Sequence, residues 1–395
     1  MKESELVESL IMRAGHYVKQ GQGALVYRAF IPAPLPPDPP VQIDAEMARL
    51  LSSAERALGR LDGVTTILPN PDLFLGMYVR QEAVLSSQIE GTQSTLEDVL
   101  RFEAGEKGQD EVKDVADVVN YVAAMNHGLQ RLPALPLSLR LIREIHERLL
   151  AGTRGGERTP GEFRRSQNWI GPHGCTLATA TFVPPPVHEM QQALDNLGKF
   201  LHERDVLPPL MHCGLAHAQF ETIHPFLDGN GRVGRLLITF LLCEQKILSQ
   251  PLLYLSLYLK AHRQEYYDRL MAVRTDGNWE SWLKFFLRGI QEVSASAAAT
   301  AKAIIETRDR HRTLVSGKAA NAAAGLKLLD YMFEHPMLTV RMVERQLGCS
   351  YLTANNLVGQ FEVLRLLKEM TGGRRNRRYR YEPYLALFEK LDAAK

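Results

Sequence analysis

The sequence predicts a mainly α-helical protein with one β-hairpin near its middle and a separate small domain at its C-terminal end. Three observations lead to this prediction. Apolar residues recur at helical spacing over most of the chain. Glycine and proline interrupt that pattern between about 153 and 187, and a different pattern begins at about 320. A chain of 395 residues is long enough for two or three domains.

Composition excludes several classes of protein. The formal net charge is only +2, so any contact with nucleic acid must come from a local patch. The cysteines are far apart and form no CxxC pair, which predicts reduced structural thiols and no zinc site. They are Cys175, Cys213, Cys243 and Cys349. No apolar run is long enough to span a bilayer and the N-terminus lacks a signal-peptide pattern, so we expect a cytoplasmic protein.

Helices follow one another along most of the chain. Residues 1–12 read as a short amphipathic helix, followed by a mixed segment and by a proline-rich run at 31–40 that can form neither helix nor central strand. We interpret this run as a strap between helices, with a ligand for a partner domain as the alternative. The helices expected from periodicity and caps cover about 44–61, 71–89, 110–131, 138–151, 187–203, 209–223, 233–245, 253–273 and 279–310, and residues 92–98 form the capped start of a further helix.

The interruption at 153–187 contains two short runs of strand-forming residues, Trp169-Ile170 and Ala180 to Val183. A turn with glycine and histidine separates them, which predicts a β-hairpin within the helical protein. Such a hairpin could position a substrate over a rigid scaffold, although a plain connecting loop is an equal alternative.

From about 320 the order helix, helix, turn, helix and hairpin predicts a winged helix-turn-helix domain. Five arginines and two tyrosines occupy the last hairpin, which favours contact with DNA phosphates over a solvated charge cluster. A protein-interaction role is the alternative. The residues expected to contact DNA are Tyr351, Thr353 and Asn355 on the recognition helix and Arg374, Arg375, Arg377 and Arg378 on the wing.

The most informative stretch is HPFLDGNGRVGR at 224–235, which lies between two apolar helical segments. Pro225 ends the first segment because proline cannot continue a helix. Gly229 and Gly231 flank Asn230 and allow backbone N–H groups to converge on an anion. The next helix starts at about Gly231, so its positive end points at the same place. This stretch therefore predicts an anion site.

Charged side chains define the chemistry of that site. Arg232 and Arg235 are three residues apart on one helical face and can bind phosphate oxygens. A carboxylate such as Asp228 beside phosphates fits a bound Mg²⁺, and His224 can accept a proton near neutral pH. A glycine turn with a capping aspartate would explain any one of these residues but not the set. Together they favour phosphoryl or nucleotidyl transfer.

The same stretch matches the Fic-family signature H-P-F-x-[D/E]-G-N-G-R-x-x-R at every position, so the sequence resembles that family of protein adenylyltransferases. Further resemblance lies in 86–91 (SSQIEG), similar to the inhibitory motif [S/T]-x-x-x-E-[G/N], and in 161–164 (GEFR) before the hairpin. It implies an N-terminal region over 1–105 with the strap and an inhibitory helix, a Fic catalytic domain over 106–310 with a β-hairpin flap, and a winged helix over 320–395.

The resemblance also implies roles for individual residues. His224 would deprotonate a Tyr, Thr or Ser hydroxyl of a target protein for attack on the α-phosphate of ATP, and Asp228 would hold Mg²⁺. The remaining nucleotide-binding positions would be Gly229, Asn230, Gly231, Arg232 and Arg235 on the phosphates, with Asn230 using its amide group, and Ile170, Gly171, Pro172, His173, Tyr266 and Tyr267 around the nucleotide and target.

The resemblance further gives Ser86, Glu90 and Gly91 an inhibitory function, in which Glu90 competes with the γ-phosphate for Arg235. Taken alone, a serine and a glutamate four residues apart near a helix end would be weak evidence for any site. Three alternatives stay open: a transferase of another phosphate-bearing group, removal of AMP from the target with Glu90 positioning water, and a DNA-binding regulator whose Fic domain senses nucleotide. A homodimer is also possible on this resemblance.

Overall fold

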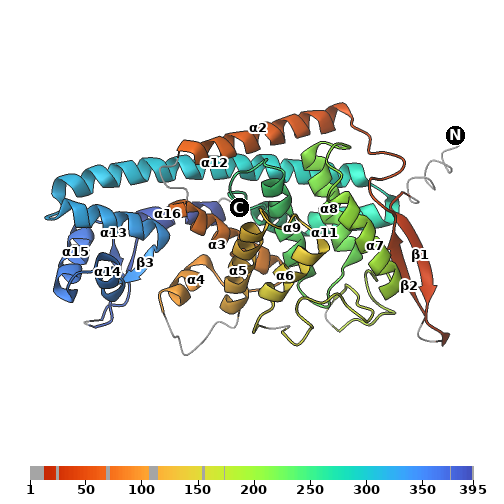
Figure 1. The fold of residues 1–395 in the computed structure, drawn as a ribbon, viewed down its shortest axis with the longest axis horizontal. Coiled ribbons are helices and arrows are strands. Elements are labelled where there is room, and N and C mark those ends of the chain that lie inside the picture. Colours follow the sequence, from red (N-terminus) through yellow and green to blue (C-terminus); the bar gives the residue numbers. More distant parts are fainter. Residues whose placement is uncertain are drawn as a thin grey trace.

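The computed structural model describes residues 13–23, 26–67, 72–105, 114–153, 156–172, 174–373 and 375–393, without the side chains of 65–74 and 390–393. The predicted helix at 1–12, His173 and Arg374 lie outside these residues. The described chain is mainly helical, as the sequence predicts, and is drawn in Figure 1. Its helices are α2 (Ala45–Ile67), α3 (Asp72–Ile89), α4 (Leu96–Glu103), α5 (Val115–Arg131), α6 (Leu139–Leu149), α7 (Val187–Phe200), α8 (Pro209–Ile223), α9 (Asn230–Glu244), α10 (Ser256–Ala261), α11 (Arg263–Asp276), α12 (Trp279–Lys318), α13 (Ala322–Glu334), α14 (Val340–Leu347), α15 (Tyr351–Val363) and α16 (Glu382–Ala393).

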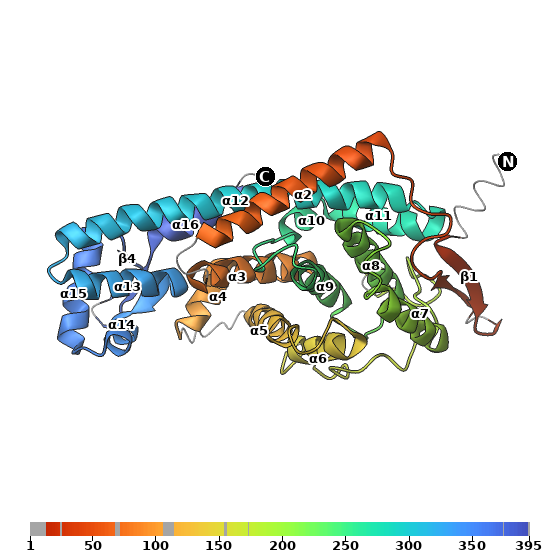
Figure 2. The ribbon, with the colours of Figure 1, turned by 45° about the horizontal axis from the view of Figure 1, so that its top comes forward.

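Helix α12 connects the two ends of the molecule (Figures 1 and 2). It has 40 residues, and α2 packs along it. Lys284 pairs with Asp44 and Glu46 at 2.6 Å near one end of this contact. The helix expected at 279–310 is confirmed and continues to Lys318. Because the helix extends from the central bundle to the C-terminal domain, one continuous apolar core includes buried residues of both.

Helices α8 and α9 lie at the centre of the bundle. The 224–235 stretch forms the loop between them and the first turns of α9. Nearly every residue of α8 and of α9 is buried, as expected for helices that are apolar all round. Helix α3 packs against α5, α9 and α10 on one side and against α13 on another. The loop between α8 and α9 is therefore fixed by the core on both of its sides.

The mixed segment before the proline-rich run is a hairpin that the sequence did not predict. Strands β1 (Gly15–Gln20) and β2 (Tyr27–Pro32) pair antiparallel, with Tyr17 opposite Phe30. The ring of Phe30 packs on Phe182, and the Phe30 N–H donates to the Val183 carbonyl at 2.9 Å. Two six-residue runs give little periodicity of their own, and this long-range contact with the 180–183 run is what stabilises them.

The proline-rich run at 31–40 follows the hairpin rather than a helix. Its first two residues end β2, and the remainder leads to α2 without helix or strand. The Ala33 carbonyl accepts a hydrogen bond from Gln219 at 2.7 Å, and Arg13 donates to the Pro39 carbonyl at 3.3 Å. These bonds attach the strap to the outside of α8 and to the start of the described chain.

The expected central hairpin is much shorter than predicted. Its two runs meet in one antiparallel bridge, in which Ile170 and Phe182 exchange both backbone hydrogen bonds, at 2.8 and 3.0 Å. Most of the segment between them is loop and turn. The glycines and prolines that marked the segment also prevent a longer ladder, because proline has no N–H to donate.

The C-terminal elements occur in the predicted order. Strands β3 (Met337–Thr339), β4 (Lys368–Glu369) and β5 (Arg378–Arg380) form a three-stranded antiparallel sheet with β5 in the middle. Helices α13, α14 and α15 precede the β4–β5 hairpin, and α16 follows it. Phe388 of α16 meets Tyr78 of α3 edge-on at 5.7 Å between ring centroids, so this domain packs directly on the central bundle.

Candidate functional site

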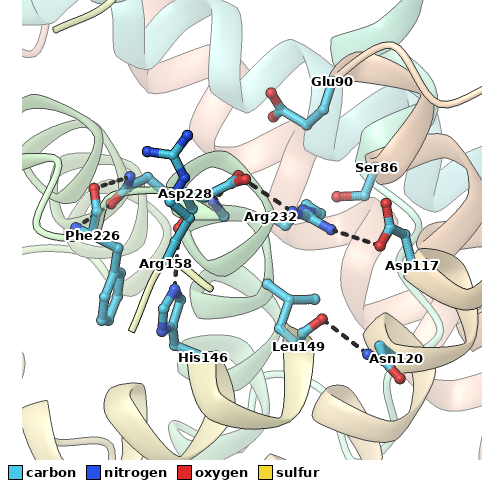
Figure 3. A network of polar contacts seen from close by, with 12 residues as sticks. Ser86, Glu90, Asp117, Asn120, His146, Leu149, Arg158, Phe226, Asp228 and Arg232 are labelled. Carbon is cyan, nitrogen blue, oxygen red and sulfur yellow. Dashed lines mark hydrogen bonds and ion pairs between the residues drawn. The ribbon is translucent and has the colours of Figure 1, made fainter. Parts of the chain in front are cut away.

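A pocket of about 370 Å³ lies where the 224–235 stretch faces the end of α3 and the start of α5. Figure 3 shows its walls, with Glu90 on one side and Asp228 and Arg232 on the other. The residues that line it are Glu90, Gly91, Thr92, Asp114, Asp117, His224, Leu227, Asp228, Gly229, Asn230, Gly231 and Arg232. The structure thus brings together residues that the sequence places far apart.

His224 caps α8 with left-handed backbone geometry, φ 49° and ψ 60°. Its carbonyl oxygen accepts hydrogen bonds from Arg164 and Asn168, both at 3.1 Å. Burial, followed by the positive charge of Arg274, lowers the pKa of His224 to about 3. The imidazole is therefore neutral at physiological pH, which is the form that a general base needs.

The turn that follows His224 is held by its own backbone and by Asn230. Gly229 has φ 77°, a conformation that favours glycine. The side chain of Asn230 is buried and bonds the Phe226 backbone twice, accepting from its N–H and donating to its carbonyl, both at 2.8 Å. This side chain therefore shapes the turn, and α9 begins at Asn230 itself; contact of Asn230 with a phosphate stays a prediction.

Arg232 lies between two carboxylates, as Figure 3 shows. Its guanidinium is 3.5 Å from Asp228 and 4.0 Å from Asp117. The Asp228 side chain is 44% exposed and faces the pocket, whereas Asp117 on α5 is buried. Burial raises the pKa of Asp117, opposed by the charge of Arg232. Asp117 is a pocket residue that the sequence analysis missed, because one aspartate in a helix gives no signal.

Arg235 is bound to the end of α3. Its guanidinium donates to the Ser86 hydroxyl at 2.7 Å, to the Ser86 carbonyl at 3.0 Å and to Glu90 at 2.6 Å. Burial favours the neutral form of Glu90, but the charge and hydrogen bond of Arg235 outweigh it and lower the Glu90 pKa. Burial opposes the charge of Arg235 as well, and Glu90 more than offsets this, so the Arg235 pKa is raised. Both partners are charged at neutral pH.

Gly231 is what lets Glu90 reach Arg235. A Cβ atom at this position would lie 2.2 Å from Glu90 Oε1 and 3.0 Å from Arg235 Nη1. A larger residue would displace the carboxylate. The pair seen in the sequence as Ser86 and Glu90, weak evidence by itself, is thus connected to the central stretch by three hydrogen bonds.

His146 of α6 contacts the turn through the Asp228 carbonyl and the Phe226 ring, and the sequence did not predict this contact. The Gly161 N–H donates to His146 Nδ1 at 2.9 Å, so the proton of the neutral ring lies on Nε2, which is 3.1 Å from the Asp228 carbonyl. The ring stacks on Phe226 with centroids 3.7 Å apart. Burial lowers the His146 pKa to about 4. A single histidine on an apolar helical face does not by itself predict that it supports a turn of the site.

Some of the residues expected around the nucleotide are exposed in the structure, and others are buried in the core. Ile170 is half-buried in the bridge with Phe182, and Gly171 and Pro172 are exposed next to it. Tyr266 is buried, and its hydroxyl lies 2.9 Å from His217 Nε2, so it belongs to the core rather than to the pocket wall. Tyr267 is 39% exposed. Of the tyrosine pair, only Tyr267 can reach a bound molecule without rearrangement.

The residues expected to contact DNA lie on one helix and one hairpin of the C-terminal domain. Tyr351 and Thr353 are exposed near the start of α15, and Arg375 is exposed on the wing. Arg377 donates to Asn355 at 2.8 Å, which attaches the wing to α15. Arg378 lies on β5 and is half-buried. DNA binding by this surface stays a prediction.

The chain is similar to proteins of one family. Residues 48–130 match the Fic/DOC family N-terminal region, and residues 136–242 match the Fic/DOC family. The sequence is 32% identical to "Protein adenylyltransferase Fic" of Aedes aegypti over 38% of this chain and 27% of that protein. It is 29% identical to the Drosophila grimshawi protein of the same name over 49% of this chain and 36% of that protein. The matches thus cover well under half of these relatives.

The structure of a Fic family protein from Desulfovibrio desulfuricans G20 has a similar fold. Its TM-score is 0.57 at 19% sequence identity, and the match covers 87% of this chain and 97% of that one. The likeness concerns the fold and covers most of both chains. Among the described residues, no helix is long and apolar enough to cross a membrane.

Proposed function

Because this chain belongs to the Fic family, we propose that it is a protein adenylyltransferase, which moves AMP from ATP to a hydroxyl of a target protein. The observation that carries the proposal is the composition of the pocket. A neutral imidazole, an exposed carboxylate, a glycine turn at a helix N-terminus and a buried arginine all line one volume of about 370 Å³. That volume is in the range of small-molecule sites.

The reaction assigns one step to each of these groups. The acceptor oxygen of the target forms a bond to the α-phosphorus, the bond from that phosphorus to the bridging oxygen of the β-phosphate breaks, and pyrophosphate leaves. His224 accepts the hydroxyl proton, for which its low pKa keeps it free. The first turn of α9 directs backbone N–H groups at the phosphates, and Arg232 adds a positive charge.

Asp228 fits a role in holding Mg²⁺. Its carboxylate is part exposed and faces the pocket, and the described residues contain no cluster of three or more metal-binding side chains. A magnesium ion held by one carboxylate takes its other ligands from nucleotide phosphates and water, which is the usual arrangement for this ion. When bound, the ion would neutralise charge on the phosphates. The side chains of the pocket position the nucleotide, and His224 deprotonates the target hydroxyl.

We include autoinhibition by Glu90 in the proposal. Arg235 is the one basic residue of the 224–235 stretch that does not line the pocket, since Ser86 and Glu90 occupy its guanidinium. A γ-phosphate would need to displace the Glu90 carboxylate to reach it. While Glu90 stays, its negative charge faces the same pocket and disfavours a productive triphosphate.

The test compares two labels on two proteins. Wild type and Glu90→Gly are incubated with Mg²⁺ and either α-labelled or γ-labelled ATP, and label on protein is measured. We expect transfer from the α position alone, increased at least about tenfold by Glu90→Gly, which corresponds to about 1.4 kcal/mol. Glu90→Gly combined with His224→Ala is the matched control and should transfer nothing. Label from the γ position would instead indicate a kinase, and equal labelling of the two proteins would remove the inhibitory role of Glu90.

A further inference from the structure

Two buried arginines outside the 224–235 stretch meet the catalytic end of α8 from different elements. Arg164 comes from the segment before the Ile170–Phe182 bridge, and Arg274 from α11. Arg164 is the last residue of the 161–164 (GEFR) segment, and neither arginine lines the pocket. Among the described residues neither makes an ion pair within 4.0 Å, which is unusual for buried cations.

Arg164 binds carbonyl oxygens only. Its side chain donates to His224 at 3.1 Å, to Ser166 at 3.1 Å and to Pro185. The backbone N–H of Arg164 donates to the Pro225 carbonyl at 2.9 Å. These bonds fix the peptide on the C-terminal side of His224, where the backbone is left-handed and a residue with a Cβ needs support.

Arg274 holds the turn of α8 that precedes His224. Its guanidinium donates to the Glu221 carbonyl at 3.1 Å and to the Thr222 hydroxyl at 3.2 Å. The ring of Phe182 stacks on it, with the guanidinium carbon 4.0 Å from the ring centroid. Because Phe182 pairs with Ile170, Arg274 connects the expected target-binding segment to the helix that carries the base.

The charges of both arginines act on the same ring. Burial lowers the pKa of each arginine only to about 10, so both stay charged at neutral pH. After burial itself, Arg274 is the largest cause of the low His224 pKa; Arg164 acts in the same direction, and Glu90 opposes them. Glu221, whose pKa burial raises to about 7, is the other titratable group on this turn.

We propose that Arg164 and Arg274 are positioning residues for His224, which fix its backbone from both sides and place positive charge beside its ring. This rests on the proposed function, since it assumes that His224 is the base. It assigns a task to two residues that touch neither nucleotide nor acceptor. It also predicts that geometry and charge can be separated, because lysine preserves the charge of arginine but not its forked hydrogen bonds.

The kinetic test uses the Glu90→Gly protein as parent and adds Arg274→Gln or Arg274→Lys, then Arg164→Gln or Arg164→Lys. We expect kcat to fall at least about tenfold in all four, with the KM for ATP changed less than about threefold. In the glutamine variants the acid limb of kcat should move to higher pH, and in the lysine variants it should stay. Arg269→Gln, an exposed arginine of the same helix, is the control and should change neither.

A second measurement does not depend on activity. The His224 ring is followed by NMR of histidine-labelled protein, its signal assigned by its absence from His224→Ala. In Arg274→Gln the midpoint of its titration should rise relative to the parent, and in Arg274→Lys it should not. The proposal would be overturned if the titration midpoint did not move in Arg274→Gln. It would also be overturned if the KM for ATP rose by as large a factor as kcat fell. If the parent transfers no AMP but the midpoint rises, the proposed function fails and the electrostatic role stands.

Discussion

Arg235 in the central bundle and Arg380 in the C-terminal domain are both buried arginines bound to glutamates. Arg235 has one carboxylate partner, Glu90, whose side chain is 39% exposed at the edge of the pocket. Arg380 on β5 pairs with Glu97 of α4 and with Glu382 and Glu389 of α16. The proposed autoinhibition requires that an incoming anion replace the partner of the first arginine, whereas the second arginine joins two parts of the molecule. Burial and charge alone do not separate these tasks, whereas the number and exposure of the partners do.

The largest effect should come from the base. In the Glu90→Gly protein, His224→Ala should lower AMP transfer by at least about a thousandfold, since general base catalysis contributes up to about four orders of magnitude. Transfer is measured with α-labelled ATP, and binding of ATP to both proteins by calorimetry. Retained transfer would mean that another group accepts the proton.

Removal of Arg235 should have the next largest effect. Arg235→Ala in the Glu90→Gly protein should lower kcat/KM for ATP by about a hundredfold, the effect expected for loss of one donor to the leaving pyrophosphate. Arg380→Ala in the same background should leave kcat/KM of the folded protein unchanged. If the two substitutions reduced kcat/KM alike, the contrast between the two arginines would disappear.

Arg380→Ala should instead reduce stability. It leaves three carboxylates of α4 and α16 without their shared cation, and we expect a loss of about 2 kcal/mol in the free energy of unfolding, moderated because those side chains are 33% to 56% exposed. Urea unfolding of the full chain measures it. Arg375→Ala, on the exposed part of the wing, is the control and should be neutral in unfolding.

The pH dependence of stability should report the Arg235–Glu90 pair. The folded pKa of Glu90 is lowered from 4.5, so the pair stabilises the fold above that pH and the contribution is lost as the pH falls through the folded pKa. Because Glu90 is part exposed, we expect no more than about 1 kcal/mol. The difference in unfolding free energy between wild type and Glu90→Gln should shrink below pH 4.5; a constant difference would contradict this.

The smallest effect on transfer should come from the wing. Arg377→Ala removes the bond to Asn355 and a predicted DNA contact, and AMP transfer should not change. If the wing binds DNA, the affinity for a duplex should fall steeply with salt, and Arg377→Ala should reduce the salt slope by about one. Absence of a salt-dependent affinity in the wild type would favour a protein partner for this domain.

The sequence predicted the helical bundle, the order of the C-terminal elements and the pocket side chains of 224–235, because these depend on periodicity and on adjacent residues. It failed where the decisive neighbour is remote. The β1–β2 hairpin depends on Phe182, and the central hairpin reduces to a single bridge. His146, Asp117 and Arg274 gave no local signal, since each is one polar residue in an ordinary segment, and the 161–164 (GEFR) resemblance did not show what Arg164 contacts.

What the sequence by itself determined is the identity of the reactive groups, because the base, the carboxylate and the glycine turn all lie within the 224–235 stretch, at the connection between two helices. Only the tertiary structure decided their state. The left-handed backbone and low pKa of His224 come from burial and from cations of other segments, and the Asn230 amide is used by Phe226. Arg235 is paired with Glu90, 145 residues earlier in the chain. Charge and burial act through space, so a local motif cannot encode them.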